Sequence, residues 1–392
     1  MDDLQGEKLK GIPPYILSVI KTEMMKQRRA GEDVMDFGMG NPDGETPRHI
    51  VDKLVEAVQN PKNHRYSASR GIYKLNLALA DWYKRRFNVD LDPNTEVITT
   101  IGAKEGISHL MYAMLNRGDT VLVPTPCYPI HNYAAALAGG NVISVPVEKG
   151  RDFFEDMVKE VHNTWPKPKV LLLNYPHNPT TEVVDVSFFE KIVAFAKENN
   201  IVVLHDNAYA EIYFDGYLPP SFLEVPGAKD VGAEFYSLSK TFNMPGWRVG
   251  FLAGNEKIIK ALERIKGYLD YGMFQPIQIA AIHALNSSHA CVEDIRAIYK
   301  KRRDVLVDGL VKLGWDVEKP KATMFVWAKV PAIYKDMGSL DFSMKLLREA
   351  KTATSAGAGF GEGGEGYIRF SLIENEHRTR QAIKNIKNMM NK

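Results

Sequence analysis

The central part of the sequence alternates short apolar runs with segments of helical periodicity, and this alternation limits the folds that the chain can adopt. Seven runs, most of them rich in β-branched residues, lie at 96–100, 120–123, 141–147, 169–174, 201–205, 234–238 and 247–252. Strands that are apolar on both sides are typical of parallel sheets with helices on both faces. The pattern therefore predicts an α/β fold in which a mainly parallel seven-stranded sheet lies between helices.

The segment 187–200 is an example of the helices expected between these strands. Ser187 and Glu190 stand three residues apart at its start, which is the spacing of a capping box. Apolar side chains then recur at helical spacing and would share one face: Phe188, Ile192 and Phe195.

The pattern changes after about residue 255. Two long helical patterns cover about 255–285 and 291–313, and they are followed by strand patterns near 323–329 and 367–372 and by a last helix from Asn375. Mixed elements of this kind are typical of a second, smaller α+β domain.

The first 45 residues contain one helical stretch, 15–29, among several prolines, and they do not resemble a separate module. We expect them to wrap onto the rest of the chain. The predicted units are an N-terminal arm that includes part of the small domain, a large domain and a small C-terminal domain, at 1–45, 46–285 and 286–392.

Composition and charge exclude several classes of protein. Hydrophobic residues make up 45% of the chain and charged residues 25%, which rules out a disordered or fibrous chain. The 50 Lys and Arg residues oppose 48 Asp and Glu, so no net field favours nucleic acid or an anionic membrane. No apolar stretch approaches the length of a membrane span, and Cys127 and Cys291 cannot form a disulfide framework. We expect a cytoplasmic protein.

A lysine follows one of the predicted strands, at the point where the chain leaves the sheet. Lys240 stands among small, hydroxyl and aromatic residues, and Arg248 follows eight positions later. Burial and a neighbouring cation both lower the pKa of an amine, and a change from ~10.4 to ~7 requires roughly 4–5 kcal/mol. Lys240 is therefore a candidate catalytic amine, and the alternative is a solvated surface lysine.

Other polar residues also follow predicted strands. Asp206 ends the strand 201–205, Tyr209 lies three residues later, and Asn178 follows the strand 169–174 in a proline-rich turn. Taken singly, each could be a turn or cap residue. Because open α/β sheets bind ligands at the carboxyl ends of their strands, we expect these side chains to converge at one site.

The segment 101–106 joins a strand to a helix through Gly102. Free backbone N–H groups at a helix N-terminus favour a phosphate, although a plain connecting turn would look the same in sequence. Two other glycine patterns are rejected. Gly359, Gly361 and Gly364 fit GxGxxG but open no helix, and the chain has no GK dipeptide and hence no Walker A loop.

The ten histidines show no HExxH motif and no zinc spacing with cysteine, so no metal is expected. His205 is interpreted as a packed residue at a strand end. Arg369 interrupts the apolar strand 367–372. A buried guanidinium requires an anion, which could be an internal carboxylate or that of a ligand.

Assembled in this order, these residues resemble the class I/II, fold-type I aminotransferases that use pyridoxal 5'-phosphate. The similarity extends over essentially the whole chain, and the block SLSKTFNMPGWRVGF at 237–251 is its most specific part. The resemblance implies the fold of pyridoxal phosphate-dependent transferases, with the cofactor in the large domain. It also implies that Lys240 bonds to the cofactor and then acts as general base and acid.

The resemblance assigns the remaining cofactor contacts. Asp206 pairs with the pyridine nitrogen, Asn178 and Tyr209 bond the phenolic oxygen, and Tyr128 stacks on the ring. The phosphate is held by Gly102, Ala103, Lys104, Ser237 and Arg248. Ala103 departs from the family pattern, because relatives often have serine there, so backbone amides must serve that corner of the phosphate.

The resemblance also assigns substrate contacts and a partner. Arg369 binds the α-carboxylate, and Asn178, Gly40 and Tyr15 contact the substrate. Asn41 belongs to the same loop as Gly40. Tyr66 reaches the phosphate in the partner subunit, which implies a homodimer with shared active sites.

Within the family, the sequence is most similar to the branch of bacterial alanine (glutamate-pyruvate) and LL-diaminopimelate aminotransferases. The segments that carry this similarity are 12–15, 268–274, 357–361 and 373–375. No arginine can be assigned to a distal carboxylate, which favours small or neutral amino acids. We expect transamination between alanine and 2-oxoglutarate, giving pyruvate and glutamate.

The alternatives are an LL-diaminopimelate or broad neutral/aspartate aminotransferase, and a pyridoxal phosphate carbon–sulfur lyase. A ligand-sensing domain fused to a DNA-binding module fits less well, since only about 45 residues precede the large domain and they carry no basic stripe.

Overall fold

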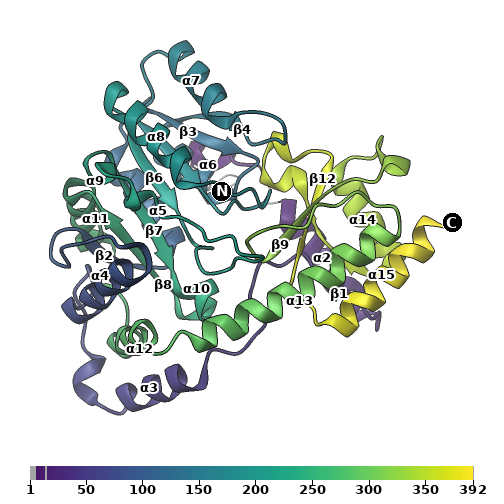
Figure 1. Cartoon of the computed structure of the whole chain (residues 1–392), viewed down its shortest axis with the longest axis horizontal. Coiled ribbons are helices and arrows are strands. Elements are labelled where there is room, and N and C mark those ends of the chain that lie inside the picture. The colour runs from purple at the N-terminus through teal and green to yellow at the C-terminus, as the bar shows by residue number, and fades with distance from the viewer. Residues whose placement is uncertain (1–5, 14–15, 392) are drawn as a thin grey trace.

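The computed structural model describes residues 6–13 and 16–391, and its central feature is a seven-stranded sheet (Figure 1). The strands, in chain order, are β2 (Val97–Ile101), β3 (Thr120–Thr125), β4 (Asn141–Pro146), β5 (Val170–Asn174), β6 (Val202–Asp206), β7 (Gly232–Ser237) and β8 (Val249–Gly254). Their spatial order is β2-β8-β7-β6-β5-β3-β4, and β8 alone among these seven runs opposite to the other six. The predicted α/β fold with a mainly parallel seven-stranded sheet is therefore confirmed.

Both faces of this sheet are buried, as the apolar runs predicted, except at the edge strand β4, which is largely exposed or half-buried. Within β3, Leu122 belongs to one apolar cluster, while its neighbours Val121 and Val123 belong to the cluster on the other face. One face packs against α5 (Ala103–Met114), α6 (Pro129–Leu137) and α11 (Glu256–Leu269). The other packs against α4 (Tyr73–Phe87), α7 (Phe153–Asn163), α8 (Val186–Asn199) and α12 (Gln275–Asn286).

The C-terminal part of the chain builds a second core. A three-stranded antiparallel sheet contains β9 (Phe325–Lys329), β12 (Tyr367–Ser371) and β11 (Ser355–Ala356). It is accompanied by α14 (Ser339–Ala350) and α15 (Glu376–Met390). The long helix α13 (Ala290–Lys312) joins the two parts, because Val292 belongs to the core of the large sheet whereas Ile295 and Leu306 belong to the second core.

The N-terminal residues pack onto this second part, as expected. Helix α2 (Ile16–Arg29) buries Ile20 and Met24 against Leu347 of α14, and β1 (Met35–Asp36) pairs with β10 (Thr352–Ala353). Helix α3 (Arg48–Val58) packs against α12 beside the large sheet.

The domain boundaries at 45 and 285 stay predictions. Among the described residues, none of the helices combines the length and apolar character needed to cross a bilayer.

Two local predictions were wrong. The helical pattern 255–285 forms two helices, α11 and α12, because Asp270 ends α11 in an extended conformation and Gly272 adopts φ 76°. Helix α8 is capped by Asp185, whose Oδ1 accepts a hydrogen bond from the Phe188 N–H at 3.1 Å. Ser187 is therefore not the cap residue and forms no capping box; its hydroxyl donates to Asp185 at 2.7 Å.

The topology places polar residues at one edge of the large sheet. β5, β6 and β7 are parallel neighbours and end at Asn174, Asp206 and Ser237. These three residues all line the same cavity.

Candidate active site

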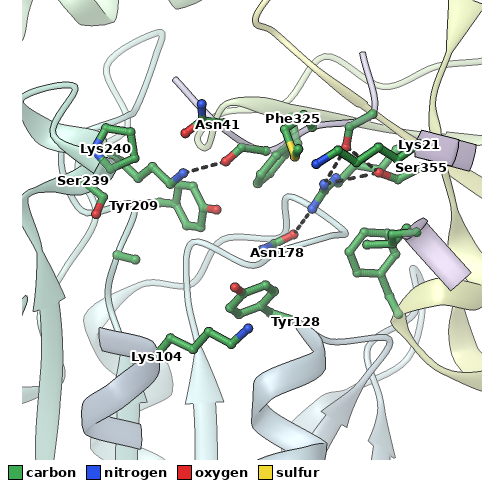
Figure 2. A pocket seen from close by; sticks show the side chains of 18 of the residues that line it. Lys21, Asn41, Lys104, Tyr128, Asn178, Tyr209, Ser239, Lys240, Phe325 and Ser355 are labelled. Atoms are coloured by element: carbon green, nitrogen blue, oxygen red, sulfur yellow. Dashed lines mark hydrogen bonds between the residues drawn. The ribbon is translucent and has the colours of Figure 1, made fainter. Parts of the chain in front are cut away.

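A cavity of about 470 Å³ lies between this sheet edge and the second part of the chain (Figure 2). The large domain contributes Lys104, Tyr128, Asn178, Asp206 and Lys240 to its lining. The opposite wall comes from α2, from the segment 36–41, and from residues on β9, β11 and β12. The cavity therefore draws together residues from distant parts of the sequence.

Lys240 lies in the short helix α10 (Leu238–Thr241), directly after β7. Its Nζ donates a hydrogen bond to the Gly40 carbonyl oxygen at 2.7 Å, as Figure 2 shows. Burial lowers the pKa of the Lys240 amine to about 7, and the positive charges of Arg369 and Arg248 act in the same direction. Near neutral pH, the Lys240 amine is therefore uncharged and nucleophilic in a large fraction of the molecules, as the sequence predicted for a catalytic amine.

Asp206 is a buried carboxylate with one oxygen still available. Its Oδ2 lies 2.9 Å from His131 Nε2, while its buried Oδ1 has no hydrogen-bond partner among the described residues. Asn174 holds the local backbone, since its Nδ2 donates to the Asp206 carbonyl oxygen and its Oδ1 accepts from the Asn178 N–H. A buried acceptor that lines a cavity suits a ligand that presents a cationic N–H.

An anion site lies at the start of α5. Gly102 is the N-cap residue of α5, with φ 77°, and no side chain caps the helix. A Cβ added to Gly102 would lie 2.2 Å from Arg248 Nη2, so the guanidinium lies directly against the free helix N-terminus. The hydroxyls of Ser237 and Ser239 lie 3.0 Å apart at the nearby end of β7. Backbone amides, hydroxyls and a guanidinium together suit a phosphate.

Arg369 is buried between two aromatic rings. Its guanidinium carbon lies 4.0 Å from the centre of the Phe325 ring and 4.6 Å from that of Phe360. Its Nη1 donates to Asn178 Oδ1 at 2.7 Å, and its Nη2 donates to Ser355 Oγ at 3.4 Å. The fork is therefore held rigidly at the cavity wall, which suits recognition of a planar carboxylate.

Most of the residues predicted from the sequence meet here. Those that line the cavity are Gly40, Ala103, Lys104, Tyr128, Asn178, Asp206, Tyr209, Ser237, Lys240, Arg248 and Arg369, and Gly102 lies against Arg248. Tyr66 does not line the cavity of its own chain; it is 86% exposed and its ring lies 4.7 Å from that of Tyr271. Tyr15 lies outside the described residues.

The sequence analysis missed His131, Asn174 and Ser239. His131 is fully buried and its ring stands edge-on to Tyr128 at 5.8 Å. A weak signal existed for it, because His131 follows Tyr128 by three residues and would share its helix face. Ser239 could have been noted as a second hydroxyl beside Lys240. His205, by contrast, is packed at a strand end as predicted, with its Nδ1 2.7 Å from Glu234 Oε2.

Glu105, His109 and Asp270 form a further cluster of groups that could ligate a metal. The Nζ of Lys266 lies 3.0 Å from a carboxylate oxygen of Glu105 and from one of Asp270. The cluster therefore already contains a cation of the chain, and it lies outside the cavity lining.

Comparison with known proteins agrees with this geometry. The family model described as Aminotransferase class I and II matches residues 32–386. This chain belongs to the class I and II aminotransferases. Enzymes of this family are pyridoxal 5'-phosphate-dependent transferases, so the aminotransferase activity, apart from its substrate, and the cofactor expected from the resemblance are confirmed.

The similarity to individual relatives also supports the assignment of this chain to the aminotransferase family. It is 53% identical over 382 residues to the glutamate-pyruvate aminotransferase AlaC of Escherichia coli K12. The matched region covers 97% of this chain and 93% of the relative. It is 42% identical over 388 residues to an LL-diaminopimelate aminotransferase of Moorella thermoacetica, covering 99% of each. A substrate-bound structure of BacF from Bacillus subtilis superposes with a TM-score of 0.93 at 38% identity, covering 98% of each chain.

The residues of the cavity fit pyridoxal 5'-phosphate. Asp206 Oδ1 is a buried acceptor without a hydrogen-bond partner among the described residues, and it suits a protonated ring nitrogen. The α5 N-terminus with Arg248 suits the phosphate, and a partly neutral Lys240 amine suits the aldehyde. The donor set therefore matches the cofactor at three separate points.

We predict that Gly102→Ala weakens cofactor binding at least about tenfold. The added Cβ would displace the Arg248 guanidinium from the helix N-terminus, and a charge-assisted hydrogen bond is worth about 1.5–3 kcal/mol. Titration of the apoenzyme with pyridoxal phosphate measures the effect. Gly216→Ala is the matched control, because Gly216 has φ +81° but nothing within 4 Å of its Cβ position. Equal affinity losses in the two variants would contradict the prediction.

We also predict that the Lys240 amine of the folded apoenzyme titrates near pH 7. Only the neutral amine reacts with acetic anhydride, so the rate of Lys240 acetylation should rise with a midpoint near 7, not near 10.5, the ordinary pKa of a lysine. Mass spectrometry after short exposures at each pH gives the profile, and the urea-unfolded chain is the control. Arg369→Gln should move the midpoint upward, because it removes a neighbouring positive charge. A midpoint above 9 in the folded protein would contradict the assignment.

Proposed function

We propose that this aminotransferase transfers the amino group of alanine to 2-oxoglutarate, giving pyruvate and glutamate. The observation that carries the proposal is the 53% identity, over nearly the whole chain, to a protein named glutamate-pyruvate aminotransferase. The cavity agrees with a small donor, since apolar side chains of Leu17, Ile20, Met24 and Phe360 line it on the side of Arg369. An LL-diaminopimelate donor is the main alternative, because relatives of that name are 42–44% identical.

In this proposal Arg369 binds the α-carboxylate of the substrate through its planar fork. The Asn178 carboxamide accepts from Arg369 through Oδ1, so its Nδ2 is free to donate to the phenolic oxygen of the cofactor, with Tyr209 as a second donor. The segment with Gly40 closes over the substrate. Tyr15 is proposed as a further contact on the resemblance alone.

Lys240 is the proposed catalytic residue. Pyridoxal phosphate supplies an electron sink for the charge that develops at the substrate Cα. The Lys240 amine would bond to the cofactor aldehyde, and once displaced by substrate it would take the proton from the substrate Cα and deliver it to the former aldehyde carbon of the cofactor. An amine with a pKa of about 7 can do both at neutral pH, because both protonation states are populated.

The other cavity residues orient the cofactor. Asp206 would hold the ring nitrogen with Oδ1, while His131 fixes the carboxylate through Oδ2. Tyr128 would cover one face of the ring. The amides of Gly102, Ala103 and Lys104 would bind the phosphate together with Ser237, Ser239 and Arg248. Because Ala103 has no hydroxyl, its backbone amide would be the only donor from that position to the phosphate.

We further propose that the enzyme is a homodimer with shared active sites. Exposed apolar and aromatic side chains gather around the 268–274 segment, and such patches mark interfaces: Tyr66 is 86%, Tyr268 87%, Leu269 55%, Tyr271 65% and Phe274 45% exposed. Ser69 Oγ donates to the Asp270 carbonyl oxygen at 2.7 Å, so the two segments form one surface. Tyr66 would extend from this surface to the cofactor phosphate of the partner.

Both cysteines are free, which agrees with the cytoplasmic location that we propose.

Single-turnover spectra test the proposed substrate. We expect alanine and glutamate to bleach the absorption of the lysine-bound cofactor quickly, and LL-diaminopimelate, aspartate and methionine to do so more slowly. Lys240→Ala should lose the absorption band and all turnover. Faster bleaching by LL-diaminopimelate than by alanine would replace the proposal with its main alternative. Release of ammonia and pyruvate from cystathionine faster than any transamination would indicate a lyase.

Mixing two inactive variants tests the shared site. Tyr66→Ala and Lys240→Ala, exchanged into hybrid dimers, should recover up to about a quarter of the wild-type activity, since half of the dimers then hold one complete site. As control, the double variant mixed with wild type forms hybrids without a complete site, so activity should fall below that of the wild-type protein present. No recovery in the first mixture would place Tyr66 outside the partner's site.

A further inference from the structure

Lys21 is a cation of the cavity that the proposed function does not use. It lies on α2 and lines the cavity together with Leu17 and Met24, which stand four residues before and three residues after it on the same helix face. Figure 2 shows its nitrogen directed into the pocket. Its ammonium forms no hydrogen bond or ion pair with any residue in 6–13 or 16–391.

The helix α2 holds Lys21 on the same side of the cavity as Arg369. Ile20 and Met24 pack against Ala353 and Ala356, which flank Ser355, a hydrogen-bond partner of Arg369. The neighbouring turn of α2 packs equally closely, because a Cβ added to Gly359 would lie 2.9 Å from Leu17 Cδ2. Gly359 immediately precedes Phe360, whose ring lies over the Arg369 guanidinium. The position of Lys21 relative to the guanidinium is therefore set by packing.

The cavity lining has more cationic side chains than carboxylates, and Lys21 is a cation without a partner among the described residues. Its described lining contains five cationic side chains, those of Lys21, Lys104, Lys240, Arg248 and Arg369, and two carboxylates, Asp36 and Asp206. Asp36 Oδ1 accepts from the backbone N–H groups of Gly38 and Met39, so it is already engaged.

Three of the other four cations have assigned partners in the proposed function. Arg248 belongs to the phosphate site, Lys240 to the cofactor aldehyde and Arg369 to the α-carboxylate. Lys104 extends from α5, at the phosphate end of the cavity, toward Tyr128 in Figure 2. Among the described cations of the lining, Lys21 is the one without an assigned partner on the Arg369 side of the cavity, where the substrate side chain would lie.

We propose that Lys21 binds the distal carboxylate of a dicarboxylic substrate, such as glutamate or 2-oxoglutarate. This inference rests on the proposed function, in which one site must accept a neutral three-carbon and an anionic five-carbon substrate in turn. Arg369 binds the carboxylate that both share. Lys21 recognises the carboxylate that only the longer substrate carries, and it is a specificity residue, not a catalytic one.

A flexible lysine suits this double requirement better than a fixed arginine does. The side chain of Lys21 is exposed, so its ammonium stays hydrated when a short substrate occupies the cavity. A buried, rigid guanidinium in that place would be left unpaired by alanine and would disfavour it. The sequence analysis looked for an arginine in this role, and it missed the lysine because only the packing of α2 brings residue 21 to the site.

The experiment compares Lys21→Met with Lys26→Met in the holoenzyme. Lys26 lies on the same helix but does not line the cavity. Lys21→Met should raise KM for glutamate and 2-oxoglutarate about tenfold, which corresponds to ~1.4 kcal/mol. KM for alanine and pyruvate, and kcat for all four, should stay within about twofold. Lys26→Met should change none of these values, and Lys21→Arg should retain the affinity for the dicarboxylates.

A binding measurement separates this inference from the proposed function. Glutarate has two carboxylates and no group that can react, and butyrate lacks the second carboxylate. Calorimetry should show that Lys21→Met weakens glutarate binding about tenfold and leaves butyrate binding unchanged. If alanine is not a substrate but glutarate shows this loss, the proposed donor fails and the role of Lys21 stands. Unchanged glutarate affinity, or equal losses for alanine and glutamate, would overturn the inference.

Discussion

Burial of the Lys240 amine beside two guanidinium groups is the constraint on which the rest of the pocket depends. The positive charges of Lys240, Arg248 and Arg369 repel each other, and the repulsion is relieved most readily when the buried amine loses its proton, because the guanidinium groups cannot lose theirs. The neutral amine is what imine chemistry requires. The two guanidinium groups, which stay charged, are the groups that a phosphate and a carboxylate would bind.

The fold makes this arrangement possible by concentrating strand ends. β5, β6 and β7 are parallel neighbours, so Asn174, Asp206 and Ser237 emerge at one edge, and Lys240 follows within the next turn of chain. Asp206 is then held by His131 from α6 and by the backbone contact from Asn174. Rigid elements thus aim the carboxylate, which is a better support for a cofactor than a loop would be.

The substrate side of the pocket is built differently. Its walls come from the C-terminal part of the chain and from α2, which is tied to that part by the small apolar cluster around Ile20 and Met24. Arg369 is held between Phe325 and Phe360, whereas the Lys21 side chain is exposed. In the proposed function, Arg369 would bind the carboxylate that all substrates share, and Lys21 would bind a second carboxylate only in substrates that carry one.

The sequence by itself determined the sheet and the chemistry of its edge. Apolar runs at regular spacing specify buried parallel strands, and the residues that follow those runs must meet at the carboxyl ends, which is why Lys240, Asp206 and Asn178 could be named in advance. Local predictions failed where a competing contact decided the outcome. Asp185, not Ser187, caps the N-terminus of α8. Asp270 and Gly272 end a helix that apolar periodicity alone would have continued.

Tertiary structure alone decided the contacts between segments that are distant in the chain. His131 reaches Asp206 across 75 positions, and Lys240 donates to Gly40 across 200. Lys21 reaches the cavity only because α2 packs on the second core. Such contacts depend on how layers pack, and packing follows from the shapes of whole buried surfaces. A single sequence records the residues on those surfaces but not which surfaces meet.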